Sequence, residues 1–213
     1  MSPEALLERV IAEVNPDVLS RARDEYHALA GPFAPADPFY EERIRAFLDW
    51  LAIERDRGAT LRTFLARHDA LSPPDQALGR ALLSSMRSLY RVHQSEHGTV
   101  IQCVFDGARF MVRTDDLPAS RLRDGDMLDG RAIGVEGIVM LAPGPVFHPR
   151  EAHAAITTLV CEARAQERSE TNILDALLRM RMRFDRFHSI RAEHVYRLDA
   201  LDRMEILAAS WAS

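Results

Sequence analysis

The chain of 213 residues contains no lysine, so all 27 of its basic residues are arginine. Without a lysine ammonium the chain cannot form a Schiff base with a carbonyl substrate. It also lacks the lysine with which a P-loop binds phosphate. A GC-rich coding sequence accounts for the arginine bias, which by itself points to no function.

Cysteine and long apolar runs are also scarce. Cys103 and Cys161 are far apart and each lies among apolar neighbours, which predicts two buried thiols and no disulfide framework. No apolar run approaches the roughly 20 residues that span a bilayer. The N-terminal "MSPEALLERV" has no basic region followed by an apolar core, as a signal peptide would. We therefore expect a soluble, cytoplasmic protein that does not enter a membrane.

The composition is that of a globular protein, with 47% apolar and 28% charged residues. This length and apolar content suffice for one large domain or two small ones. The net charge of −5 argues against a general affinity for nucleic acid or anionic lipid.

Proline-based start signals mark helices in the first part of the chain. Ser2-Pro3, Asn15-Pro16, Asp37-Pro38 and Ser72-Pro73 each place a capping side chain before a proline, and Thr60 gives a weaker signal. Apolar residues follow each signal at helical spacing. We expect five helices joined by short loops in residues 1–87.

From Ser88 the apolar residues alternate instead of following the helical period. About five strands are expected in "LYRVHQSE", "TVIQCVF", "ARFMVRT", "MLDGRAIGV" and "GIVML", with glycine-containing turns such as Asp106-Gly107 between them. Five short strands are too few for a sandwich but suffice for a small closed or partly open barrel, and closure would remove unpaired edges. We expect a small, antiparallel, barrel-like β module over residues 88–148, which ends in a linker, "APGPVFHP".

Residues 149–213 return to the helical period, so the predicted fold class is α+β. The longest apolar stripe consists of Ile173, Leu177, Met180, Phe184 and Phe187. Because such a stripe needs a partner surface, we expect the C-terminal helices of residues 149–213 to dock on the N-terminal ones. Docking on a second copy of the chain, to give a homodimer, is the alternative.

The same stretch presents arginines opposite the stripe. Arg179, Arg183 and Arg186 share one helical face, and this pattern suits contacts to phosphate or nucleic acid. It also suits an ordinary solvated face whose arginines pair with acidic residues. Leu178 and Met182 lie near this face, which favours a helix covered on both sides. Both interpretations stay open.

In the β module the candidate binding residues are Tyr90 and Arg131. Small barrels often bind oligonucleotides through one face, with aromatic platforms on which bases stack. Tyr90 alone would be a thin platform, and acidic residues balance the arginines of the module. The sequence therefore argues against nucleic acid as the partner.

No motif assigns a reaction. The chain has no HExxH, no CxxC and no paired Cys/His spacing, so we predict no metal site and no cofactor. It has no GxSxG nucleophile elbow and no P-loop. Catalytic residues stay unassigned.

The segments "FLDWLAIERDRGATLRTFL", "LSPPDQALGRALLSSMRSLYRV" and "LRDGDMLDGRAI" resemble a group of functionally uncharacterised bacterial proteins. In these, a helical segment precedes a small β module with an L-x-x-G-D-x-L-x-x-R run. The run is matched here by Leu122, Gly125, Asp126, Leu128 and Arg131. Some of these proteins end in a cysteine-rich SEC-C zinc motif, which this chain lacks. The resemblance implies the same helix-and-barrel arrangement and no particular activity.

Three functions remain open on the sequence alone. By elimination the first is a non-enzymatic binding or adaptor protein, whose partner is another protein or a second copy of the chain. The second is a small enzyme with dispersed catalytic residues, which would need a deep pocket containing a titratable group of shifted pKa. The third is a weak nucleic-acid binder that uses the β module or the arginine-rich helix.

Overall fold

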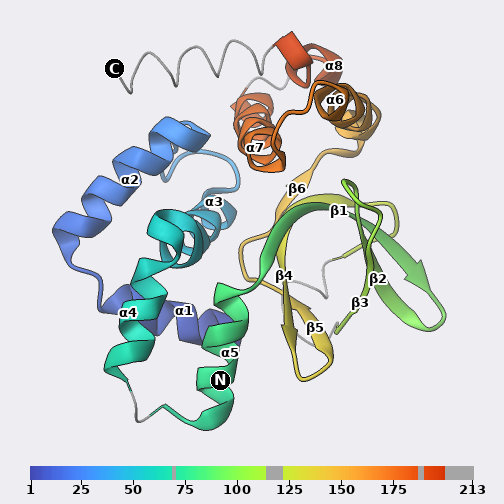
Figure 1. The fold of residues 1–213 in the computed structure, drawn as a ribbon. Coiled ribbons are helices and arrows are strands. Elements are labelled where there is room, and N and C mark those ends of the chain that lie inside the picture. Colours follow the sequence, from blue (N-terminus) through green and yellow to red (C-terminus); the bar gives the residue numbers. More distant parts are fainter. Residues whose placement is uncertain (69–70, 114–121, 187–189, 200–213) are drawn as a thin grey trace.

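The computed structural model describes residues 1–68, 71–113, 122–186 and 190–199. The fold is α+β, as the sequence predicts: helices from both ends of the chain pack around a small closed barrel (Figure 1). No helix in the described part of the chain is both long and apolar enough to cross a bilayer.

Five α-helices precede the barrel: α1 (Pro3–Ala12), α2 (Pro16–Ala30), α3 (Tyr40–Asp49), α4 (Ala59–Arg67) and α5 (Pro73–Leu83). The predicted caps at Ser2, Asn15 and Ser72 are confirmed, since each side chain accepts a hydrogen bond from a backbone N–H of the first turn. Helix α3 begins two residues after the predicted Asp37-Pro38 signal. There the Asp37 carboxylate accepts a hydrogen bond from the Ala34 N–H instead of capping the helix.

Helix α3 does not end at Asp49 but widens into a π-helical turn, η1 (Trp50–Glu54). A 3₁₀ turn, η2 (Arg55–Arg57), and Gly58 then lead into α4. Asp56, Arg57 and Gly58 all have positive φ, so the chain reverses sharply here. Isolated π turns are rare and occur often at functional sites.

The barrel consists of β1 (Met86–Ser95), β2 (Gly98–Cys103), β3 (Arg109–Val112), β4 (Met127–Val135) and β5 (Ile138–Leu141). Its strand order is β1-β2-β3-β5-β4, and pairing of β1 with β4 closes it. The predicted strand number and barrel-like form are confirmed, and of the two forms left open, closed or partly open, the barrel has the closed one. One pair differs from the antiparallel prediction, because β3 and β5 run parallel at Val112 and Val139. This is the arrangement of a five-stranded Greek-key barrel of the OB type.

The predicted exit linker contains a sixth strand, β6 (Val146–His148), so that interpretation is wrong. Strand β6 pairs antiparallel with the first residues of β4, with Met127 opposite His148. Prolines on both sides made the segment look like a linker. A three-residue strand is too short to show alternation.

After the barrel come η4 (Arg150–Ala152), α6 (His153–Ala165), α7 (Glu170–Arg186) and α8 (Ala192–Val195). Helix α7 does pack on the N-terminal helices α2 and α3, but through Leu178 and Met182 and not through the apolar stripe. Ile173, Leu177, Met180 and Phe184 pack instead in the core that α6 and α7 share with the barrel. Phe187 lies outside the described residues. Of the two cysteines, Cys103 is buried as predicted but Cys161 is exposed.

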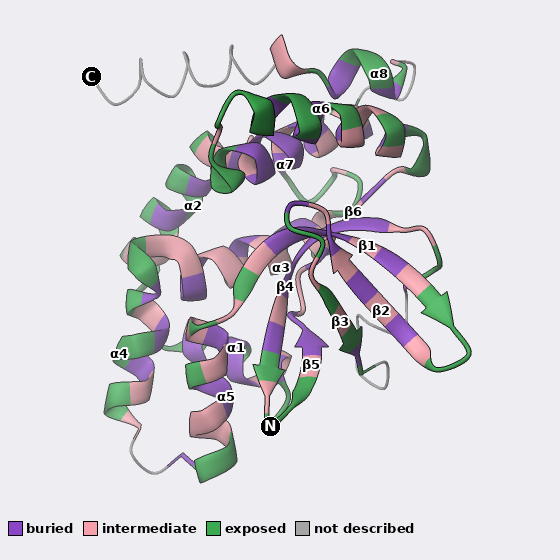
Figure 2. Ribbon diagram, turned by 45° about the vertical axis from the view of Figure 1, so that its right-hand side comes forward, coloured by how far each residue is buried: buried purple, intermediate pink, exposed green. Residues whose placement is uncertain are grey.

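Three hydrophobic cores hold the elements together (Figure 2). The first fills the barrel and continues under α6 and α7. The second joins the outer side of β4 and β5, through Ile133 and Met140, to α1, α4 and α5. In the third, Leu178 and Met182 of α7 pack on α2 and α3. The helices therefore cover one side of the barrel and leave the outer side of β2 and β3 in solvent (Figures 1 and 2).

Candidate functional site

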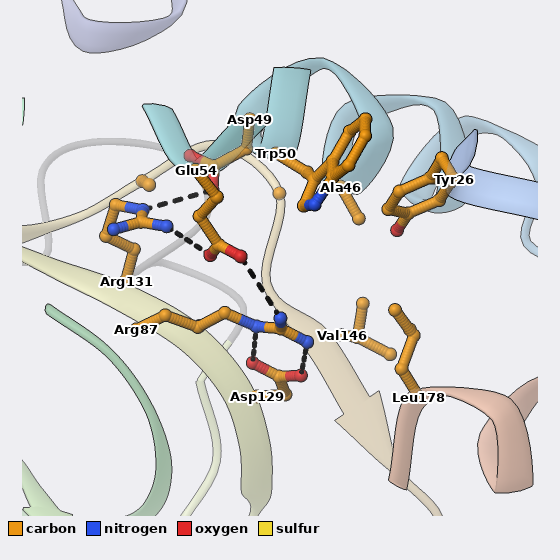
Figure 3. Close-up of a pocket in the computed structure, with 13 residues that line it drawn as sticks. Tyr26, Ala46, Asp49, Trp50, Glu54, Arg87, Asp129, Arg131, Val146 and Leu178 are labelled. Carbon is orange, nitrogen blue, oxygen red and sulfur yellow. Dashed lines mark hydrogen bonds and ion pairs between the residues drawn. The ribbon is translucent and has the colours of Figure 1, made fainter. Parts of the chain in front are cut away.

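A cluster of charged side chains lies where the N-terminal helices, the barrel and α7 meet (Figure 3). We call it the junction cluster. It consists of Asp49 of α3, Glu54 of η1, Arg87 of β1, Asp129 and Arg131 of β4, and Asp175 of α7.

Local backbone geometry explains how these side chains converge. A π turn brings residues five apart to the same side of the helix, which places the carboxylates of Asp49 and Glu54 together. On the barrel, Arg87 lies directly opposite Arg131 in the β1–β4 register. Asp129 is two residues before Arg131, so both point from the same face of β4.

Each arginine binds two or more carboxylates. Arg87 donates from Nε and Nη2 to the two oxygens of Asp129, at 2.9 and 2.7 Å, and from Nη1 to Asp175, at 2.8 Å. Arg131 donates to Asp49 at 3.1 Å and also to Glu54. The two networks meet at Glu54, whose other oxygen lies 3.4 Å from Arg87 Nη1. Bidentate pairs of this kind fix geometry as well as charge.

The cluster contains four carboxyl groups and two guanidinium groups. Burial raises the pKa of Asp49, Asp129 and Asp175, and the nearby arginines only partly oppose this effect. In addition, Asp49 Oδ1 is buried and has no hydrogen-bond partner among the described residues. The Asp49, Asp129 and Asp175 carboxyls therefore hold protons more tightly than they would in water.

The cavity beside the cluster has a volume of about 20 Å³, which is enough for roughly a single water molecule. Tyr26 and Trp50 line it on the helical side, and burial raises the pKa of the Tyr26 phenol well above its ordinary value. A cavity of this size cannot admit an organic substrate. Among the described residues, no three of His, Cys, Asp and Glu are placed to hold a metal ion.

The structure does not bring the predicted binding residues together. Arg131 is buried in the junction cluster. Tyr90 is buried inside the barrel, where its hydroxyl donates to the Met86 carbonyl. A platform for stacking bases has to face solvent, and Tyr90 does not.

The three predicted arginines of α7 lie on the side of the helix that faces α2. Arg179 donates to the Ala28 and Leu29 carbonyls at the carboxyl end of α2. Arg186 donates to the Pro32 carbonyl and pairs with Asp37 at 3.0 Å. Arg183 is exposed. Arg179 thus satisfies free carbonyls at the C-terminus of α2, and Arg186 holds the loop that follows, so both have a structural role.

Sequence reasoning missed most of the junction cluster. Asp49 lies in the "FLDW" stretch that carries the family resemblance, but nothing local marked its carboxylate as buried. Arg87 and Asp129 occupy strand positions on a barrel face that the helices cover. A pairing of "MRSL" with "LDGR" would have shown two arginines opposite each other, and this was the available signal.

A second candidate surface is the uncovered side of the barrel, which we call the open barrel face. It is formed by two rows of outward side chains across β1, β2 and β3: Arg91, Gln102 and Arg109 in one row, and His93, Val100 and Met111 in the other. Met111 is 59% exposed, the most exposed of the large apolar side chains in the described part of the chain. OB-type barrels bind their ligands through this part of the fold.

Comparison of the chain with protein-family models, with curated proteins and with solved structures yields no match. The resemblance to the bacterial group therefore stays a prediction. A fold alone does not define a function. The features of this chain that bear on its function are the junction cluster and the open barrel face.

Proposed function

We propose that this chain is a non-enzymatic binding or adaptor protein that binds a partner protein through the open barrel face. The observation that carries the proposal is the exposure of Met111 beside Val100 on the side of the barrel that no described helix covers. Exposed apolar side chains rimmed by polar ones are typical of protein interaction sites.

The composition of the open barrel face indicates the kind of partner. Arg91 and Arg109 flank Gln102 in one row, with Arg91 Nη2 3.4 Å from the Thr157 hydroxyl of α6 at the border of the face, while the other row is mainly apolar. An extended segment with acidic and apolar side chains would complement both rows. A partner of this kind would also be steered electrostatically to the arginines.

Nucleic acid fits this face less well. Neither row contains a phenylalanine, tyrosine or tryptophan, and bases bind open barrel faces chiefly by stacking on such rings. Two arginines supply little of the phosphate contact on which non-specific binding depends. Catalysis at the junction cluster is also disfavoured, because its cavity holds no more than about one water.

The proposal can be tested with a matched pair of variants. Met111 on the open barrel face and Met86 at the start of β1 are both exposed, at 59% and 54%. Met111→Glu places a negative charge on the proposed surface, whereas Met86→Glu places it elsewhere. The tagged wild-type chain and both variants are used to recover partners from lysate of the source organism.

We expect a stoichiometric partner with wild type and with Met86→Glu, and its loss with Met111→Glu. A photo-reactive residue at position 111 should cross-link to the same partner. Equal recovery with both variants, or no stoichiometric partner, would overturn the proposal. Sedimentation of the purified chain separates a further outcome: a dimer that only Met111→Glu dissociates would identify a second copy as the occupant.

A further inference from the structure

The apolar row of the open barrel face continues beyond β3. Met111 is opposite Val100 on β2, and on its other side β3 pairs in parallel with β5 at Val112 and Val139. One residue before this pair, Met111 and Ile138 are neighbours across the seam between the two strands. Val112 lies in the barrel core, and successive side chains of a strand point to opposite faces, so Met111 and Ile138 both point outward.

Four apolar side chains therefore form one continuous row across the barrel, which we call the seam stripe: Val100, Met111, Ile138 and Val135. Ile138 is 44% exposed and lies next to the still more exposed Met111. The stripe ends at Val135, which is opposite Ile138 on β4 and packs against the core of α1, α4 and α5. Three strand spacings of roughly 4.8 Å make the seam stripe about 14 Å long.

Arginines border the seam stripe on both sides. Arg109 comes two residues before Met111 on β3 and Arg113 two residues after it, so all three point outward from the same face. Both arginines are exposed, and Arg113 contacts Met140 on the outer side of β5, at 3.3 Å. Arg91 extends the first border onto β1. The outward positions of β2 and β3 contain no aspartate or glutamate, so this face is positive in a chain whose net charge is −5.

The two borders determine the shape of a complementary partner. An extended segment points its side chains to two opposite faces, so one that fills the stripe cannot also reach both borders. It would match the two rows of the open barrel face but not the border at Arg113. A helix presents an apolar row with a flanking row on each side. Its turns rise about 5.4 Å, close to the strand spacing, so side chains three or four residues apart would meet successive strands.

A second copy of the chain suits the seam stripe less well. In a two-fold dimer the same patch is used on both copies, so the arginine borders of one copy would face those of the other. Like charges placed against each other across an interface are unfavourable. Carboxylates of a different protein would instead complement both borders.

We propose that the seam stripe and its arginine borders bind an amphipathic helix of another protein, whose apolar side chains are flanked on both sides by aspartate or glutamate. The inference rests on the proposed function, because both use the open barrel face. It adds that the bound segment is helical and that it reaches β5 at Ile138.

Photo-cross-linking tests the shape of the partner segment. The full chain, with a diazirine side chain at position 111, 138 or, as control, 86, is irradiated in lysate of the source organism. Mass spectrometry then identifies the partner residues that are linked. We expect positions 111 and 138 to link to one segment, at residues three or four apart and next to acidic residues, and position 86 not to link to it. Linked residues two apart, a linked second copy of the chain, or no link from position 138 would overturn the proposal.

Variants of the seam separate this inference from the proposed function. Ile138→Glu should lose the partner as Met111→Glu does, whereas Met86→Glu should keep it. Loss with Met111→Glu but not with Ile138→Glu would contradict the seam stripe and leave the proposed function intact. Retention of the partner by all three variants would contradict both. Melting temperatures of the variants confirm that each is folded.

Charge reversals test the two borders. The linked segment, as a synthetic peptide, is titrated into the purified full chain. Arg109→Glu and Arg113→Glu should each weaken binding by about three- to tenfold, and Arg62→Glu, an exposed arginine of α4, should not. A proline at the centre of the peptide should abolish binding, because it breaks a helix. An unchanged affinity of the proline peptide, or of either border variant, would count against a helix between two arginine borders.

Discussion

Arg87 and Arg131 lie directly opposite each other on β1 and β4, an arrangement that is unfavourable for two like charges. Four carboxylates, from α3, η1, β4 and α7, surround the two arginines and offset the repulsion between their positive charges. Buried ion pairs of this kind contribute little relative to apolar packing, but removing one partner leaves uncompensated charge. At the scale of the residue, each arginine therefore matters chiefly because it neutralises buried carboxylates. The ion pairs themselves add little net stability.

Replacement of Arg131 tests this argument. Arg131→Met should reduce the free energy of unfolding by about 3–5 kcal/mol, because Asp49 and Glu54 lose their guanidinium partner in a buried site. Urea unfolding measures the change. Arg150→Met, which breaks the exposed pair with Asp126, serves as control and should cost less than about 1 kcal/mol. Similar losses in both variants would contradict a buried role for Arg131.

His148 makes stability depend on pH. Its ring is buried beside Tyr196, its Nε2 has no hydrogen-bond partner, and burial lowers its pKa from 6.5 to about 3, with Arg181 and Arg87 adding to the effect. The unfolded chain therefore binds a proton at this ring between pH 6.5 and 3, and the folded chain does not. The free energy of unfolding should therefore decrease as the pH falls below 6.5, by up to about 1.4 kcal/mol per pH unit.

The measurement is the free energy of unfolding of wild type and His148→Phe between pH 7 and 4. The junction carboxyls, whose pKa values are raised, act in the opposite direction: their stabilising contribution is lost as pH rises. Because both proteins contain these carboxyls, the difference between the two curves isolates the histidine. We expect the wild-type curve to fall more steeply below pH 6.5; parallel curves would rule out His148 as the source.

At the scale of the element, chain-local signals located most helices and strands. Proline after a capping residue marked α1, α2 and α5, and Asp106-Gly107 marked the β2–β3 turn. What depends on tertiary contact was not predictable. No residue pattern marked the π turn after Asp49. The short strand β6 and the parallel β3–β5 pair have no local signal, since each forms only against a strand distant in sequence.

The sequence predicted less of the candidate site than of the helices and strands. Arg131 was a candidate as an arginine of the β module, yet it is buried because helices from both ends of the chain cover that barrel face. Leu178 and Met182 were correctly placed near a second covered side of α7, but the covering element is α2 and α3 of the same chain. Sequence periodicity shows that a face is apolar; it does not show which partner covers it.

The loop between β5 and β6 packs so closely on α3 that one residue controls the contact. A Cβ atom at Gly144 would lie 2.8 Å from the Arg45 carbonyl carbon and 2.9 Å from the Ala46 nitrogen, both backbone atoms that cannot move aside. Gly144→Ala should therefore cost about 1–3 kcal/mol. Gly134→Ala in β4, where the added methyl meets nothing within 4 Å, should be nearly neutral. Thermal unfolding of both variants checks this, and equal melting temperatures would contradict it.

At the scale of the whole molecule, helix α7 connects the three parts that the sequence divided. One side of α7 closes the barrel core, the other packs on α2 and α3, and Asp175 reaches the junction cluster. The predicted boundaries at residues 87 and 148 separate stretches of different secondary structure. They also cut through all three hydrophobic cores, so they need not separate units of folding.

This sharing of cores predicts a single cooperative unfolding transition. Trp50 fluorescence, in a Trp211→Phe background, reports on the helical part, while amide exchange at Val92 and Ile101 reports on the barrel. Both probes should give the same free energy of unfolding and the same urea dependence, because losing either part exposes the apolar face of the other. If residues 88–148 were an independent domain, the barrel amides would stay protected at urea concentrations where Trp50 is already exposed.

The isolated fragment 88–148 should accordingly fail to fold, since it lacks the α6 and α7 side chains that complete its core and the α1 and α5 side chains that cover Ile133 and Met140.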